Sequence, residues 1–134
     1  LTILPSAAIS AWRQTHFSTT ANAGNAANAF DADRDGESNL LEFATAQNPL
    51  VASSASASLV RTGTVLEFTY PRSKAAVQDG MSFTVEWSDS LDQWSSVGVT
   101  EEVLSDNGTV QSVRARVAAG SAGQRFIRLS VATP

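Results

Sequence analysis

A helical pattern of apolar residues opens the chain. Ile9, Trp12 and His16 recur at spacings of three and four residues, and Phe17 closes the segment. Ser6 stands just before this pattern, follows a proline, and belongs to the residue types that cap a helix N-terminus. These positions predict a helix that starts near Ser6.

A second helical segment follows a polar stretch. Residues 18–29 are mostly Ser, Thr, Ala, Asn and Gly, which is typical of a surface loop or a weak helix. Leu40, Phe43 and Ala44 then return to helical spacing. Because Pro49 disfavours the α conformation at Asn48, this pair predicts the end of the second helix.

Beyond residue 58 the apolar pattern changes to period two. Leu66, Phe68 and Tyr70 fall on one face of a predicted strand, with Glu67 and Thr69 on the other. The alternation recurs at Met81, Phe83, Val85 and Trp87, and again at Ile127, Leu129 and Val131. Further short strands are expected at residues 59–61 and 94–97.

A hairpin signal lies in the same part of the chain. Asn107-Gly108 tolerates positive φ, and it lies between the expected strand segments 101–104 and 110–117. Several short strands with regular turn signals predict an antiparallel β-sandwich of the immunoglobulin or fibronectin III kind. The expected fold is therefore α+β, with a helical part at 1–50, an Ala/Ser-rich linker at 51–58 and the sandwich at 59–134.

The composition narrows the classes of function. With 43% hydrophobic and 16% charged residues, the chain is too apolar for disorder and too lightly charged for a nucleic-acid binder. No segment has the length needed for membrane insertion. The absence of cysteine excludes a disulfide framework, a thiolate zinc site and a cysteine nucleophile. The chain starts at Leu1 without an initiator Met, which favours a processed product or a piece of something longer.

Acidic residues are concentrated in one loop, at positions 31–42. The loop reads Asp31-Ala32-Asp33-Arg34-Asp35-Gly36-Glu37-Ser38-Asn39-Leu40-Leu41-Glu42 and fits the EF-hand pattern at its defining positions. Its candidate metal ligands are the side chains of Asp31, Asp33, Asp35 and Glu42, the backbone carbonyl of Glu37, and Asn39 acting through a water. Gly36 permits the sharp bend that turns the carboxylates inward.

The residue types in this loop favour calcium. Ca²⁺ takes six to eight oxygen ligands, whereas Mg²⁺ prefers a smaller octahedral shell and retains its waters. Four converging carboxylates without a cation would repel one another. The alternative is an exposed Asp/Gly turn ahead of a helix, since both residue types are common in turns. A helix–calcium loop–helix is expected because the pattern keeps several positions in register at once.

Three segments of the chain occur in a characteristic order. They are Trp12-Arg13-Gln14-Thr15-His16-Phe17, the acidic loop continued through Phe43-Ala44 to Asn48-Pro49, and a β-part with Phe83-Thr84-Val85-Glu86-Trp87-Ser88-Asp89-Ser90-Leu91-Asp92-Gln93-Trp94 and Arg125-Phe126-Ile127-Arg128-Leu129. This series resembles a C-terminal module of large exported proteins of environmental bacteria, and the loop alone also resembles dockerins and thrombospondin type 3 repeats. Phe43 stands where Tyr is frequent, and Ser18 and Ala46 stand where Gly is frequent.

The resemblance implies an extracellular or cell-surface module that binds calcium and has no settled biochemical activity. Our leading hypothesis is a non-enzymatic structural or adhesion module whose helical part is stabilised by calcium. One alternative is a carbohydrate-binding module of a secreted enzyme that recognises surface glycans through exposed aromatic residues. Another is a filament subunit whose apolar tail, residues 1–4, adds as a strand to another copy.

Three further groups of residues have ordinary explanations. His16, the only histidine, is expected to pack on its helix, and Trp87 shares a face with Phe83 and Val85, which favours a core position. Tyr70 and Trp94 are less constrained and are candidates for exposed rings. Arg114, Arg116 and Arg128 are together a candidate anion site, but Glu67 and Glu86 offer cross-strand partners.

Overall fold

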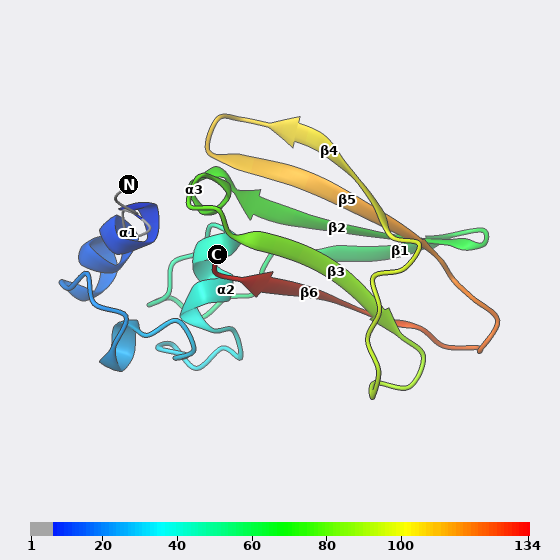
Figure 1. Ribbon diagram of the computed structural model, residues 1–134, viewed down its shortest axis with the longest axis horizontal. Coiled ribbons are helices and arrows are strands. Elements are labelled where there is room, and N and C mark those ends of the chain that lie inside the picture. Colours follow the sequence, from blue (N-terminus) through cyan, green and yellow to red (C-terminus); the bar gives the residue numbers. More distant parts are fainter. Residues whose placement is uncertain (1–6) are drawn as a thin grey trace.

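The computed structural model describes residues 7–134 and places helices at one end of two antiparallel sheets (Figure 1). The helical elements are α1 (Ala7–Phe17), the 3₁₀ turn η1 (Gly24–Ala26), α2 (Asn39–Ala44) and α3 (Lys74–Gln78). The strands are β1 (Ser58–Thr62), β2 (Val65–Ser73), β3 (Ser82–Ser88), β4 (Thr100–Asp106), β5 (Val110–Ala118) and β6 (Phe126–Ala132). Both the proposed cap Ser6 and the strand-like tail 1–4 lie outside the described residues.

The predicted first helix is confirmed as α1, and a distant carboxylate holds its N-terminus. Both oxygens of Asp79 accept backbone N–H groups, from Ala8 at 3.0 Å and from Ile9 at 2.8 Å. These donors have no partner within a helix, so Asp79 acts as a capping residue supplied from beyond α3. His16 packs edge-on against Trp12 with ring centroids 5.1 Å apart, as expected for a helix residue.

The second helix, α2, is shorter than the sequence predicted. It begins where the Ser38 hydroxyl accepts the Leu41 N–H, and its last helical residue is Ala44. Gln47 N–H donates to Glu42 O at 2.8 Å and Ala46 N–H to Phe43 O at 3.3 Å, which together form a Schellman turn. Ala46 takes φ 62°, the left-handed conformation that ends the helix. The predicted end at Asn48-Pro49 is therefore wrong, because the chain turns before it reaches the proline.

The larger sheet has the strand order β1-β2-β5-β4, all antiparallel. Leu66, Phe68 and Tyr70 of β2 stand opposite Val117, Ala115 and Val113 of β5, so the alternating apolar face is the inner face. Val113 and Ala115 are buried, and Tyr70 is only 1% exposed, which corrects the expectation that its ring might be exposed. The predicted Asn107-Gly108 hairpin is confirmed, with Gly108 at φ 92°.

The smaller sheet pairs β3 with β6 and packs against the first. Val85 on β3 clusters with Tyr70, Val113 and Ala115, and Ile127 and Leu129 of β6 pack against this cluster. The strand expected at residues 94–97 is wrong, since that segment makes only one bridge, Trp87 with Ser95, before β4 begins at Thr100. The fold is thus α+β with two small antiparallel sheets.

One apolar cluster joins the helices to the strands. Ile9 of α1, Phe43 of α2, Ala76 of α3 and Met81 are buried together, and Val131 of β6 packs against them. The sequence did not predict α3, which lies at this junction. The helical elements therefore share a core with the strands, and the acidic loop, which leads into α2, is attached to that core.

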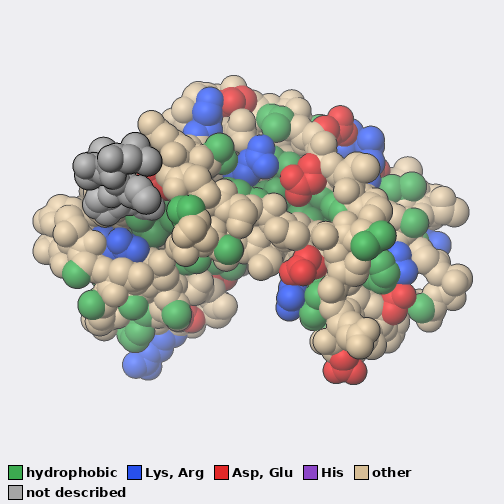
Figure 2. Space-filling model, viewed as in Figure 1, with side chains coloured by type: hydrophobic (Ala, Val, Ile, Leu, Met, Phe, Trp, Pro, Cys, Tyr) green, Lys and Arg blue, Asp and Glu red, His purple; other side chains and the backbone are tan. Residues whose placement is uncertain are grey.

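The surface carries charges of both signs, interspersed with small apolar groups (Figure 2). Within residues 7–134, every helix is too short or too polar to cross a bilayer. Figure 2 also shows a hollow along one edge, between the helical end and the far end of the strands.

Candidate metal centre

The acidic loop lies between η1 and α2, and short backbone contacts close it. Asn39 N–H donates to Phe30 O at 2.8 Å, and Leu40 N–H donates to Asn28 O at 3.0 Å. These bonds bring the two ends of the loop together at the start of α2. Glu42, the last loop residue, is thereby carried back towards the aspartates by the first turn of the helix.

Within the loop, aspartate side chains fold the backbone around themselves. Asp31 accepts from Asp35 N–H at 3.2 Å and from Gly36 N–H at 2.9 Å, and Asp33 accepts from Asp35 N–H at 3.3 Å. Gly36 has φ 93°, which is the sharp bend expected at this position, and Arg34 also has positive φ, at 60°. The outcome is a tight turn whose carboxylates face a common point.

Four carboxylates converge at that point. One oxygen from each of Asp31, Asp33, Asp35 and Glu42 lies within 4.8 Å of the others, so the cluster can hold a metal ion. The three aspartates are half-buried, whereas Glu42 is 0% exposed. The sequence predicted all four as side-chain ligands, and the fold brings all four together.

Glu42 is the most informative member of this cluster. Neither of its carboxylate oxygens has a hydrogen-bond partner among the described residues, and one oxygen of Asp33 is likewise buried and unpartnered. Buried acceptors are nearly always satisfied, because an unpaired buried charge is strongly destabilising. A cation held between the four carboxylates would satisfy these oxygens.

Burial and mutual repulsion in this cluster also shift the pKa values of its acidic residues. Burial, reinforced by the negative charges of Asp33, Asp35, Glu37 and Asp31, raises the pKa of Glu42 from 4.5 to about 8. Desolvation also raises the pKa of Asp33, whereas backbone N–H donors, with that of Ser53 first, lower the pKa of Asp35. Without a cation, the loop would favour a proton on Glu42 at neutral pH.

Glu37 and Asn39 lie beside the cluster in different roles. The Glu37 carboxylate turns to the chain after α2, where it accepts from Ala55 N–H at 2.9 Å and from Gln47 Nε2 at 3.0 Å. The Glu37 side chain is therefore held by the chain after α2 and is not one of the four converging carboxylates, which leaves its backbone carbonyl as the candidate ligand. Asn39 is 1% exposed and donates through Nδ2 to Asn25 O and Ala27 O, while its Oδ1 is buried without a partner among residues 7–134.

A contact that the sequence did not reveal ties residues 51–57 to the loop. Ser53 N–H donates to Asp35 Oδ2 at 3.1 Å, and the Ala55 N–H bond to Glu37 lies two residues further along. Ser53 Oγ also donates to Gln47 at 3.0 Å. The Ala/Ser-rich segment expected to be a plain linker is therefore held against the metal loop by the loop's own carboxylates.

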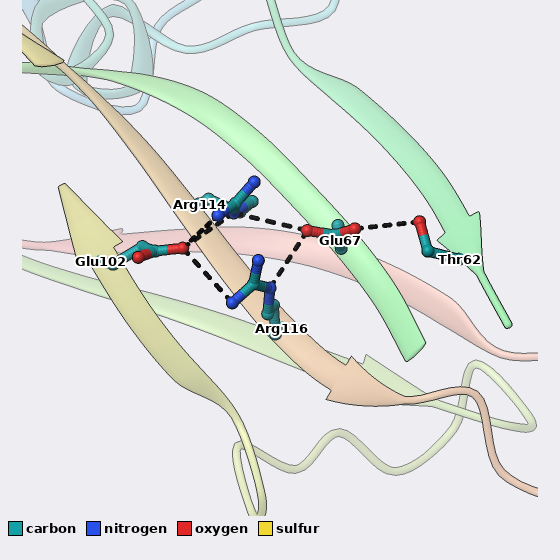
Figure 3. A network of polar contacts seen from close by, with 5 residues as sticks. All are labelled: Thr62, Glu67, Glu102, Arg114 and Arg116. Atoms are coloured by element: carbon teal, nitrogen blue, oxygen red, sulfur yellow. Dashed lines mark hydrogen bonds and ion pairs between the residues drawn. The ribbon is translucent and has the colours of Figure 1, made fainter. Parts of the chain in front are cut away.

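The arginines of the larger sheet are paired with glutamates, as the cross-strand interpretation predicted (Figure 3). Arg116 Nε donates to Glu67 at 3.0 Å, and Arg114 contacts both Glu67 and Glu102. Arg128 lies on the smaller sheet and pairs with Glu86 at 3.1 Å. This face is a neutralised charge network rather than an anion site.

The tryptophans of the β-part are covered by arginines. Arg125 lies 3.9 Å from the Trp87 ring centroid, and Arg128 lies 4.2 Å from that of Trp94. Trp87 also donates through Nε1 to Val97 O at 2.9 Å. One face of each ring is therefore covered by a guanidinium.

Comparisons with known proteins show no neighbour: no family model, curated protein or solved structure matches the chain. Its function is therefore inferred from its own geometry.

Proposed function

We propose that residues 31–42 bind one calcium ion and that the chain is a structural or adhesive module stabilised by it. The observation that carries this proposal is the fully buried Glu42 carboxylate, whose two unpartnered oxygens face three aspartates. A divalent cation there would satisfy these oxygens and cancel the repulsion among the four carboxylates. A bidentate glutamate at the last loop position is the usual arrangement in calcium loops of this length.

The donor set favours calcium over other metals. All four converging ligands are carboxylates, and the loop can add the Glu37 carbonyl and a water held by Asn39. Oxygen-only shells suit hard cations, whereas zinc and copper select imidazole and thiolate. Calcium tolerates the irregular, crowded geometry of a loop with a bidentate glutamate better than magnesium does.

An extracellular location is part of the proposal. A single loop with no paired EF-hand to preorganise it should bind calcium in the range of about 10⁻⁵ to 10⁻³ M, typical of weaker sensors and extracellular modules. The resemblance to modules of exported bacterial proteins points the same way. The role we assign is structural: the ion fixes α2 and the loop, and the two small sheets form a compact β-sandwich behind them.

Calorimetric titration of metal-free protein with Ca²⁺ and Mg²⁺ tests the assignment. We expect one calcium site, weaker magnesium binding, and loss of calcium binding in Asp31→Ala and Glu42→Ala. Asp92→Ala is the matched control, because it removes one carboxylate from an exposed turn far from the loop. Absence of calcium binding in the wild-type protein, or equal loss in the Asp92 variant, would refute the proposal.

Chelation gives an independent readout. A ligand that binds only the folded state adds about 2.7 kcal/mol at a hundredfold excess over its dissociation constant. The melting temperature should therefore fall on chelation and recover when calcium is restored. Superimposable melting curves with calcium and with chelator would contradict a stabilising role.

A further inference from the structure

A polar cavity lies beside α1. It has a volume of about 380 Å³ and is bounded by α1, the 18–29 loop, the start of β3 and the residue after β6. Its polar lining consists of Ser10, Arg13, Thr20, Asn22, Asn28 and Thr133. Ile9 and Met81 form its apolar floor, and the described residues that line it include no acidic side chain. The chain has a net charge of −4, whereas the charged residue in the described lining of this cavity is the cation Arg13, which suits an anionic ligand.

Arg13 is buried in this lining without an ion-pair partner. The residue is 6% exposed, and among residues 7–134 its guanidinium donates to two neutral acceptors, Asn28 Oδ1 at 2.6 Å and Thr20 O at 3.4 Å. Its Nε is buried with no hydrogen-bond partner in the described part of the chain. None of the ion pairs found among residues 7–134 includes Arg13.

Asp79, the acidic residue whose charge acts on Arg13, already accepts other hydrogen bonds. Asp79 acts on Arg13 through space and raises its pKa, against the larger lowering caused by burial. Both Asp79 oxygens, however, accept the backbone N–H groups of Ala8 and Ile9. Arg13 Nη1 and Nη2 each make one hydrogen bond, so each keeps a second N–H group that can be donated to a ligand in the cavity together with the positive charge. Charge-assisted bonds of this kind are the strong ones.

We infer that this cavity binds the carboxylate of an acidic sugar, with Arg13 as its anchor. A guanidinium matches a carboxylate in shape and charge. The amide and hydroxyl groups of Asn22, Asn28, Thr20 and Thr133 suit sugar hydroxyls, and Ile9 and Met81 offer an apolar surface for a ring face. The volume is within the range of small-ligand sites.

An acidic sugar fits this cavity better than an acidic peptide. Peptide recognition uses an extended strand edge or a groove with repeated pockets, whereas this site is a single cavity with one cation and neutral polar walls. None of the four converging carboxylates lines the cavity, but Asn28, which does, also accepts the Leu40 N–H at the close of the acidic loop. The test is therefore made with calcium saturating, so that the loop is in one state throughout.

The experiment is a titration of the calcium-saturated protein with glucuronate, with glucose, acetate and an Asp-containing dipeptide as comparison probes. We expect glucuronate to bind and the other three to bind at least about tenfold more weakly, because only glucuronate offers both a carboxylate and a ring of hydroxyls. Arg13→Lys should weaken glucuronate binding by about tenfold or more, since an ammonium cannot reproduce the guanidinium geometry. Equal binding of glucose, or tighter binding of the dipeptide, would overturn the inference.

A second variant protects the test against a folding defect, because Arg13 also holds the 18–29 loop. Thr133→Phe fills the cavity from an exposed residue just beyond β6 and leaves the Arg13 hydrogen bonds in place. It should abolish glucuronate binding at an unchanged melting temperature. Wild-type protein that does not bind glucuronate, or Thr133→Phe that binds it normally, would refute the site.

Discussion

Replacing Glu42 by glutamine should change stability in opposite directions with and without calcium. In the metal-free protein, burial and four neighbouring acids raise the pKa of this carboxyl from 4.5 to about 8. Between these two pH values the folded state keeps a proton that the unfolded chain releases, so stability falls as the pH rises. At about 1.4 kcal/mol for each pKa unit, the loss by pH 7 amounts to about 3 kcal/mol.

Glutamine has the same shape and no proton to release. Glu42→Gln should therefore raise the metal-free stability at pH 7 by up to about 3 kcal/mol and remove the fall between pH 4.5 and 8. With calcium present, the variant supplies one ligand oxygen fewer and no charge, so it should lose most of the roughly 2.7 kcal/mol that a hundredfold excess of ligand provides.

Urea denaturation at several pH values, with chelator and with calcium, measures both effects. Asp92→Asn is the control: it removes one charge from an exposed position outside the acidic loop. It should change the stability of the metal-free and of the calcium-bound protein little. The reasoning would be refuted if Glu42→Gln lowered the stability of the metal-free protein and of the calcium-bound protein by the same amount.

Three further changes have expected outcomes. Ala46→Gly should raise the melting temperature by an amount corresponding to about 1 kcal/mol, because Ala46 has φ 62°, which glycine adopts without strain. A lower melting temperature for Ala46→Gly than for the wild-type protein would contradict this. Asp79→Ala should lower the free energy of unfolding by about 1 kcal/mol and reduce the helical circular-dichroism signal, because the first turn of α1 loses its cap. Asp79→Asn should lower it less, because the amide oxygen can still accept one of the two N–H groups. Ala55→Pro removes the N–H donated to Glu37, so residues 51–57 should become cleavable by elastase even with calcium bound, whereas the wild-type protein should be cut there only after chelation.

Local patterns in the sequence determined the acidic loop and most of the regular elements. The sequence could point to Asp31, Asp33, Asp35 and Glu42 as a converging cluster because an acidic loop of this pattern is a short segment whose geometry depends on residues close in the chain. Alternation along β2, β3, β5 and β6 predicted the faces of the strands, and Asn107-Gly108 predicted the hairpin, for the same reason.

Tertiary structure decided what depends on distant parts of the chain. The cap of α1 comes from Asp79, which is 71 residues from its partner Ala8, and no spacing rule connects them. The burial of Glu42 and of Tyr70 also depends on which elements pack over them. Residues 94–97 were expected to form a strand, but within the described chain they make only one bridge, between Ser95 and Trp87 near the end of β3. The pattern of side chains determines which face of a helix or strand is apolar. Which other element packs on that face is decided by the tertiary structure.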